Sequence, residues 1–407
     1  MTSKKRNRVI PYSRQKITDE DIDAVLSVLR SDYLTQGPTV ELFEQAISEY
    51  VGSRFALAVS SCTAGLHCLY SALYKPGVSN YLLTTPLTFA STVNAAKLVG
   101  YKPVLIDINL RTFGLGCEAL ENALEHLRRL DAESNIVVTN VHYSGCAVNS
   151  CRISNIAEKY EAIVVEDAAH SFGGSYDDGS KVGSPGTSAA SVFSFHPVKS
   201  MTTGEGGVVV TDSEPLFNRM KRLRSHGISK SEEELEDPDL QIDSNGAGWW
   251  YYEVLELGFN YRLTDIQAAL GLSQLKKIDS FMNERKLIAN RYDKIFELKG
   301  LDHLKYPAAI PKKLSANHLY PILVDYPALG LTRADFIVEL NNRNIRTQVH
   351  YIPIYRHPFY RNLLSQISSF PNTEFFYSRC LSIPIYPGLS ITEQDYVIDQ
   401  ISQLCVI

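Results

Sequence analysis

The sequence lacks the cysteine pattern of a small secreted or zinc-bound protein. Its seven cysteines are an odd number, and none forms a CxxC pair. This argues against both a disulfide framework and a zinc site. The basic first eight residues are followed by no secretory apolar segment, and no apolar run approaches the ~20 residues that span a bilayer. We therefore expect a cytoplasmic protein with no membrane partner and no metal.

A strong net charge is missing as well. The chain has 40 Lys+Arg and 45 Asp+Glu, which gives a net charge of -5. No general attraction to nucleic acid follows from this balance, so any bound anion must be held locally. Hydrophobic residues make up 44% and charged residues 21% of the 407 residues. That composition is typical of a globular chain, and the length predicts roughly two to three domains.

Short apolar runs alternate with helical patterns in the first two thirds of the chain. We expect strands at 55–59, 81–85, 103–107, 135–139 and 162–166, and helices at 63–73, 118–130 and 153–160. Strands separated by helices of this length predict a mostly parallel sheet covered by helices. The runs at 191–195 and 207–211 are joined by too few residues for a helix, so this pair is expected to be antiparallel. The predicted fold class is therefore α/β with a mixed sheet.

The pattern changes after a polar, acidic stretch at 229–245. Residues 263–291 predict one or two long helices. Apolar runs at 319–324 and 347–351, a helix at 333–343 and a C-terminal helix after Thr392 follow. We expect a large domain over 1–275 and a smaller α+β domain over 276–407.

Three separate features could bind parts of one cofactor. The turn around Ser61 and Thr63 lies between a strand and a helix, where free N–H groups favour an anion, although simple helix capping is the better explanation of this turn taken alone. Asp167 ends a predicted parallel strand, where α/β sheets form their ligand crevice, or else it caps the next helix. Lys199 follows an apolar strand and faces a glycine-rich turn. A desolvated lysine there suits imine chemistry, whereas an ordinary surface lysine is the alternative.

An anion-binding helix end, an aspartate for a pyridine nitrogen and an imine-forming lysine are the needs of pyridoxal 5'-phosphate (PLP). Two other patterns carry less weight. The glycines at 114 and 116 fit a loose dinucleotide fingerprint, but they do not directly follow a strand. The acidic run at 232–237 is better explained as a solvated loop than as a metal site.

Motifs along nearly the whole chain resemble those of the DegT-type sugar-nucleotide aminotransferases, which have the aspartate aminotransferase fold. The matching motifs are LTQG at 34–37, SCTAG at 61–65, VEDAAH at 165–170, SFHPVK at 194–199, GEGG at 204–207, RSHG at 224–227, GFNYR at 258–262 and QVHY at 348–351. Within the family, WWYYE at 249–253, NHLY at 317–320 and VHYIPIY at 349–355 are similar to the transaminases of pseudaminic acid biosynthesis.

The resemblance implies roles for individual residues. Lys199 would form the imine with PLP and transfer protons, and Asp167 would pair with the pyridine nitrogen. Phe89 would stack on the ring, and His170 would lie near its 3-hydroxyl. The remaining cofactor contacts would come from Ser61, Thr63, Ala64, Ser194 and Asn260, the last reaching over from the neighbouring subunit of a homodimer.

The resemblance also implies a sugar-nucleotide site formed by Tyr12, Tyr33, Leu34, Thr35, Arg262 and Tyr351. Arg224, His226 and Arg262 are candidates for the diphosphate. Core packing is the alternative for Phe89 and Tyr351, and pairing with an acidic neighbour is the alternative for Arg262.

The implied reaction is the transfer of an amino group from L-glutamate to C4 of a UDP-linked 4-keto-6-deoxy-N-acetylhexosamine. Alternatives are C3 or C4 amination of a dTDP- or GDP-linked ketosugar, and a non-catalytic regulatory protein of the same fold. A sugar dehydratase of the family is disfavoured, because such relatives have histidine where this chain has Lys199. No nucleic-acid partner is expected.

Overall fold

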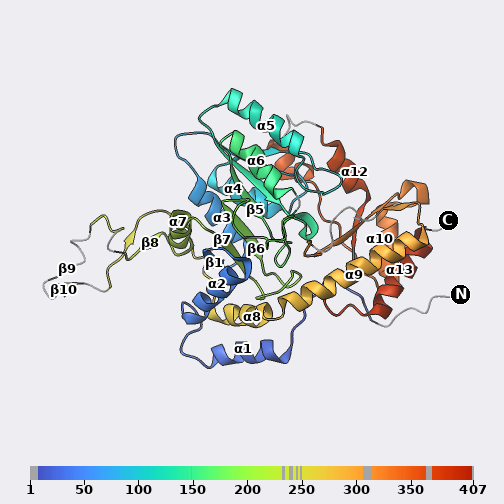
Figure 1. The fold of residues 1–407 in the computed structure, drawn as a ribbon, viewed down its shortest axis with the longest axis horizontal. Coiled ribbons are helices and arrows are strands. Elements are labelled where there is room, and N and C mark those ends of the chain that lie inside the picture. Colours follow the sequence, from blue (N-terminus) through green and yellow to red (C-terminus); the bar gives the residue numbers. More distant parts are fainter. Residues whose placement is uncertain are drawn as a thin grey trace.

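A central sheet with helices on both faces forms the larger part of the molecule, and the C-terminal third forms a smaller lobe beside it (Figure 1). The computed structural model describes residues 8–147, 149–231, 234–237, 242–243, 246–247, 250–305, 314–363 and 369–405.

The large sheet has seven strands in the order β1-β7-β6-β5-β4-β2-β3. Neighbouring strands run parallel from β6 to β3, whereas β7 is antiparallel to both β1 and β6. The expected mixed, mostly parallel sheet is confirmed. The strands are β1 (Phe55–Val59), β2 (Asn80–Thr84), β3 (Lys102–Leu105), β4 (Asn135–Val141), β5 (Ile163–Asp167), β6 (Ala190–Ser194) and β7 (Gly207–Thr211).

Side chains of the sheet alternate between two helical layers. Leu57 and Val59 of β1 pack with α3, α4 and α7, whereas Ala56 and Ala58 face α2 and α8. Helices α5 and α6 cover the same face as α2 and α8, over β2, β4 and β5. Each fully buried Leu or Val side chain stabilises the fold by about 1.5–3 kcal/mol. The helices of this part are α1 (Asp19–Leu29), α2 (Pro38–Val51), α3 (Cys62–Leu73), α4 (Ala90–Val99), α5 (Cys117–Leu130), α6 (Ser150–Lys159), α7 (Glu214–Arg224) and α8 (Asp265–Leu275).

The region predicted to form one or two long helices contains α8 and α9 (Ile278–Lys299). Helix α8 begins at a capping box in which Thr264 and Gln267 bind each other's backbone N–H. Helix α9 belongs to a separate hydrophobic cluster with the C-terminal lobe. That lobe contains a three-stranded sheet, β12 (Leu304–Lys305), β13 (Tyr320–Val324) and β14 (Cys380–Ile383), with helices α10 (Arg333–Asn342), α11 (Pro358–Leu363), α12 (Pro371–Arg379) and α13 (Ile391–Cys405). The domain boundary after residue 275 stays a prediction.

Two short hairpin pairs project away from the large sheet in Figure 1. They are β8 (Ile228–Ser229) with β11 (Glu253–Val254), and β9 (Ile242–Asp243) with β10 (Gly246–Ala247). Two residues of the predicted acidic loop, 232 and 233, lie outside the described residues. Glu234, from the same run, pairs with Arg222 at 2.6 Å. Within the described part of the chain, no helix is long and apolar enough to cross a membrane.

Candidate active site

One cavity of about 820 Å³ lies at the carboxyl ends of β4, β5 and β6. This is the edge where parallel α/β sheets bind their ligands. The turn between β1 and α3 lines one side, and residues 348–352 from the C-terminal lobe line another. The residues that the sequence analysis selected and that line this cavity are Tyr12, Ser61, Thr63, Phe89, Asp167, His170, Ser194, Lys199 and Tyr351.

Asp167 is the last residue of β5 and pairs in the sheet with β4 on one side and β6 on the other. Its carboxylate is buried, and Oδ2 accepts a hydrogen bond from the Thr92 hydroxyl at 2.6 Å. Oδ1 accepts one from the backbone N–H of Ala169 at 3.2 Å. Two donors from different segments therefore hold this carboxylate at the cavity.

Lys199 lies in the turn after β6 and is half-buried. Among the described residues, none forms a hydrogen bond or ion pair with its Nζ. Burial lowers the pKa of Lys199 to about 8, against the opposing effects of Cys62 and Asp167. About a tenth of such amines are uncharged at pH 7. The structure thus provides an amine that can act as a nucleophile and as a base near neutral pH.

The N-terminus of α3 points its first turn at the cavity. Ser61 is the N-cap, and its hydroxyl oxygen accepts a hydrogen bond from Ala64 N at 3.1 Å. Ser61 therefore caps the helix and also lines the cavity. β7 passes very close to this turn, because a Cβ atom at Gly207 would lie only 2.6 Å from Cys62 N. Glycine is the residue that permits this approach.

Aromatic and imidazole rings also line the cavity. His170 Nε2 lies 2.8 Å from the Tyr351 hydroxyl, and the rings of Phe89 and Tyr351 are 5.8 Å apart. Burial, with a smaller contribution from Lys199, lowers the pKa of His170 well below its usual value. His170 is therefore uncharged at neutral pH, and its Nδ1 is buried with no partner among the described residues. Phe89 is 60% exposed, so core packing does not explain it.

The remaining predicted residues do not line the cavity of a single chain. Ala64 lies within the first turn of α3. Tyr33 and Leu34 are exposed, and Thr35 forms a bridge with Thr264. Asn260 is exposed, and its backbone forms an isolated antiparallel β-bridge with Ser225. The backbone of Arg262 forms another with Val59, next to the α3 turn.

The positively charged candidates differ in their partners. Arg224 is bound to Glu44 at 2.6 Å and to the carbonyl of Ala58 at 2.9 Å, so its guanidinium holds α2 to β1. No ion pair of Arg262 with a described residue is present. His226 is exposed and does not contribute to the cavity.

Histidines line the cavity to an extent that the sequence analysis did not anticipate. Besides His170, they are His142, His196, His318, His350 and His357. The rings of His170 and His318 are 4.4 Å apart, although His318 comes from the C-terminal lobe. Burial lowers the pKa of His350 to about 3. His142 could have been selected from the sequence, because it directly follows an apolar run that predicts a strand, just as Asp167 ends such a strand. In the described part of the chain, no cluster of His, Cys, Asp or Glu is suited to a metal ion.

An α/β fold with a lysine and an aspartate at one edge of its sheet fits an aminotransferase, and the comparison with known proteins shows that class. Residues 15–402 match the DegT/DnrJ/EryC1/StrS aminotransferase family. The chain is 38% identical over 392 residues to the UDP-4-amino-4,6-dideoxy-N-acetyl-beta-L-altrosamine transaminase of Campylobacter jejuni, which covers 96% of both chains.

Solved structures show the same architecture. Helicobacter pylori PseC, an aminotransferase of pseudaminic acid biosynthesis, superimposes with a TM-score of 0.86 at 33% identity and covers 98% of this chain and 99% of its own. A Streptococcus pneumoniae protein described as a sugar aminotransferase, Spr1654, was solved in its PLP form; it has a TM-score of 0.82 at 26% identity and covers 98% of both chains. The protein belongs to the DegT/DnrJ/EryC1/StrS aminotransferase family. It is a sugar aminotransferase.

Proposed function

We propose that the protein is a PLP-dependent transaminase that moves an amino group from L-glutamate to C4 of a UDP-linked 4-keto-6-deoxy-N-acetylhexosamine. The observation that carries this proposal is the convergence of Lys199 and Asp167 on one cavity beside the N-terminus of α3. The similarity to a transaminase named for a UDP-linked 4-amino-4,6-dideoxy sugar supports the choice of nucleotide and carbon.

The residues in the cavity fit PLP. Nζ of Lys199 and Nδ1 of His170 have no partner among the described residues, and the N-terminus of α3 suits a phosphate. We assign Lys199 to the covalent link, Asp167 to the pyridine nitrogen, and His170 to the 3-hydroxyl. Ser61, Thr63, Ala64 and Ser194 would hold the phosphate, and Phe89 would cover the ring.

PLP, when bound, supplies an electron sink for the electrons left at the α-carbon of the amino donor. The protein supplies the proton transfer. Nζ of Lys199, in its uncharged form, would take the proton from that carbon and would then donate it to the cofactor. The carboxylate of Asp167 would keep the proton on the pyridine nitrogen, and the two donors from Thr92 and Ala169 hold that carboxylate in place. Uncharged His170 adds no competing positive charge beside Lys199.

The substrate assignment predicts a specific product. Purified protein with L-glutamate should form an amine at C4 of the UDP-linked ketosugar, with kcat/KM about tenfold or more above that of a dTDP-linked ketosugar. Mass spectrometry and NMR of the product measure both properties. An amine at C3, or a preference for the dTDP-linked substrate, would overturn the substrate assignment and leave the aminotransferase class unaffected.

We further propose a homodimer with shared active sites. Asn260, Arg262 and the segment 33–35 lie in neighbouring stretches outside the cavity of their own chain. Tyr33 is 57% exposed and Leu257, close to Asn260 in sequence, is 86% exposed. Contiguous exposed apolar patches mark interaction surfaces, and we infer that these two side chains belong to one. A second copy of this chain would bury them. Asn260 would then reach the phosphate site of the partner subunit. The sugar nucleotide would be contacted by the segment 33–35, Arg262, Tyr12 and Tyr351.

Mixed dimers test this arrangement. Lys199→Ala and Asn260→Ala chains are each expected to be inactive. After subunit exchange, one of the two sites in each mixed dimer has both residues intact, so an equal mixture should recover about a quarter of the wild-type activity. A mixture of Lys199→Ala and Asp167→Asn chains is the matched control, because both residues act in the same chain and no recovery is expected. If subunits exchange and the first mixture stays inactive, Asn260 does not act across the dimer.

A further inference from the structure

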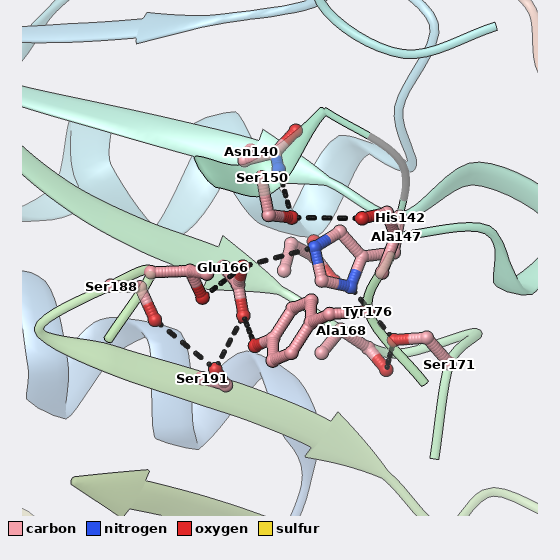
Figure 2. A network of polar contacts seen from close by, with 12 residues as sticks. Asn140, His142, Ala147, Ser150, Glu166, Ala168, Ser171, Tyr176, Ser188 and Ser191 are labelled. Atoms are coloured by element: carbon pink, nitrogen blue, oxygen red, sulfur yellow. Dashed lines mark hydrogen bonds and ion pairs between the residues drawn. The ribbon is translucent and has the colours of Figure 1, made fainter. Parts of the chain in front are cut away.

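The buried carboxylates of the described residues are Asp21, Glu166, Asp167 and Asp265. Burying a carboxylate is costly unless it is paired, so the partners of each indicate what it does. Asp167 is assigned to the cofactor. Glu166 accepts hydrogen bonds from two neighbouring hydroxyls, which point at it in Figure 2, and Asp21 is held by side chains of α8. Asp265 differs from these, because its partners belong to a segment that the proposed function uses.

The carboxylate of Asp265 binds the N-terminus of α2, although Asp265 itself is the first residue of α8. Its Oδ2 accepts a hydrogen bond from Gly37 N at 2.8 Å, and its Oδ1 accepts one from Thr39 N at 2.9 Å. Helix α2 has no side-chain cap of its own, because its N-cap is Gly37 and its first residue, Pro38, has no N–H. The carboxylate lies at the N-termini of two helices, where the helix dipoles favour negative charge. It replaces the missing cap of α2.

The same residue holds the exposed segment 33–37. Asp265 N donates to the carbonyl of Leu34 at 3.0 Å, and Thr35 pairs with Thr264 in an isolated antiparallel bridge. Residues 33–36 are all exposed, so packing of their side chains contributes little. Gln36 has a positive φ of 56°, a conformation that persists only where the surrounding structure holds it. Hydrogen bonds to the start of α8 therefore hold this segment in its conformation.

Gly37 shows how closely the segment approaches Asp265. A Cβ atom at this position would lie 2.5 Å from Tyr33 Cβ and 2.8 Å from Asp265 Oδ1. The φ of Gly37 is −98°, which any residue can adopt, so the position requires glycine for space alone. A larger residue would displace the segment from the carboxylate.

Asp265 closely follows Asn260 and Arg262 in the chain, and the proposed function assigns both of these to the shared site. Their stretch is attached to the turn before α3, because Ser60 N donates a hydrogen bond to the carbonyl of Tyr261 at 2.8 Å. Asp265 itself does not line the cavity. Its carboxylate therefore joins the exposed segment to a stretch beside the proposed phosphate site.

We propose that Asp265 is a positioning residue for the sugar nucleotide, which holds the segment 33–37 and the stretch of Asn260 and Arg262 as one unit. Asp265 touches no reacting atom and acts through the segment 33–37. The amino donor is small and binds at the cofactor, whereas a sugar nucleotide is long enough to extend to this unit. The role in substrate binding rests on the proposed function, whereas the cap on α2 is a property of the protein without substrate.

Single-turnover kinetics of the two half-reactions test the positioning role. In Asp265→Asn the amide NH₂ faces either Gly37 N or Thr39 N, so one of these donors loses its acceptor. Transfer from L-glutamate to the cofactor should stay within about twofold of the wild type. Transfer to the UDP-linked ketosugar should lose about tenfold or more in kcat/KM, since a displacement of about 1 Å can cost 10²-fold. Equal losses in both half-reactions, or no loss in a folded variant, overturn the positioning role.

Two more variants separate this cap from helix capping in general. Gly37→Ala displaces the segment without changing Asp265, so it should show the same selective loss, and it carries the test if Asp265→Asn does not fold. Asp107→Asn is the matched control, because Asp107 caps α12 through Asn372 N at 3.0 Å and Thr373 N at 2.9 Å. Helix α12 does not line the cavity, so both half-reactions should stay within about twofold of the wild type. The same selective loss in Asp107→Asn would overturn the particular role of Asp265.

Hydrogen exchange of the full-length protein tests the cap without any substrate. The N–H of Gly37, Thr39 or both should exchange about tenfold or more faster in Asp265→Asn than in the wild type, and at the wild-type rate in Asp107→Asn. Unchanged exchange in Asp265→Asn overturns the cap, whether or not the protein is active. If the wild type takes no amino group from L-glutamate, or accepts neither a UDP- nor a dTDP-linked ketosugar, the proposed function fails, and the exchange result still decides the cap.

Discussion

Replacing Lys199 with alanine lowers the rate of transamination by about 10³-fold or more while the protein stays folded. The expected loss is this large because the substitution removes both the group that binds the cofactor covalently and the base that moves the proton. The side chain is half-buried, and no described residue pairs with its Nζ, so the fold loses little. Steady-state kinetics and thermal unfolding of wild type and variant measure the two effects.

Two further variants test whether the rate depends on the amine of Lys199 itself, rather than on its positive charge or on a lysine elsewhere in the protein. Lys199→Arg keeps a positive charge but has no amine able to form an imine, so it should be as inactive as Lys199→Ala. Lys181→Ala removes a partly buried lysine that donates to the Tyr50 hydroxyl at 3.0 Å and does not line the cavity, so it should leave the rate unchanged. Borohydride reduction of the holoenzyme followed by peptide mapping should place the reduced adduct on Lys199. An adduct on another lysine would show that the assignment is wrong.

The strands of the sheet could be predicted because the apolar pattern that forms each strand lies within a few consecutive residues. Runs such as 135–139 are apolar on both faces, as a strand covered by two helical layers must be, and β4 occupies 135–141. The antiparallel pair was also predictable, since the residues between β6 and β7 are too few for a crossover helix. The ends were less accurate: β3 ends at Leu105, two residues earlier than expected. That end depends on where pairing with β2 stops, which is a property of the assembled sheet.

The candidate site was predictable in part for a similar reason. Asp167 and Ser194 end parallel strands, and such ends meet at one edge of the sheet. His318 and His350 were not assigned roles, because their place in the cavity depends on how the C-terminal lobe packs against the sheet.

Asp167→Asn should lower kcat by about 10²–10³-fold, the range seen when one electrostatic contact to a developing charge is removed. Asparagine has nearly the same shape but no charge, so the proton on the pyridine nitrogen is no longer favoured. Its amide would also turn an NH₂ group toward one of the two donors, the Thr92 hydroxyl or the Ala169 N–H, that now bind the carboxylate. Part of the loss therefore comes from poorer orientation.

Comparison with two other variants distinguishes the charge from the shape. Thr92→Val removes one hydrogen bond to Asp167 but leaves the carboxylate, so a loss of about tenfold or less is expected. Asp167→Glu keeps the charge but adds a methylene at a position that is only 5% exposed, so it should be poorly placed yet retain more activity than Asp167→Asn. The measurements are kcat, KM and the affinity for PLP of each protein. If Asp167→Asn is more active than Asp167→Glu, shape rather than charge is the contribution of Asp167, and the proposed pairing with the pyridine nitrogen is wrong.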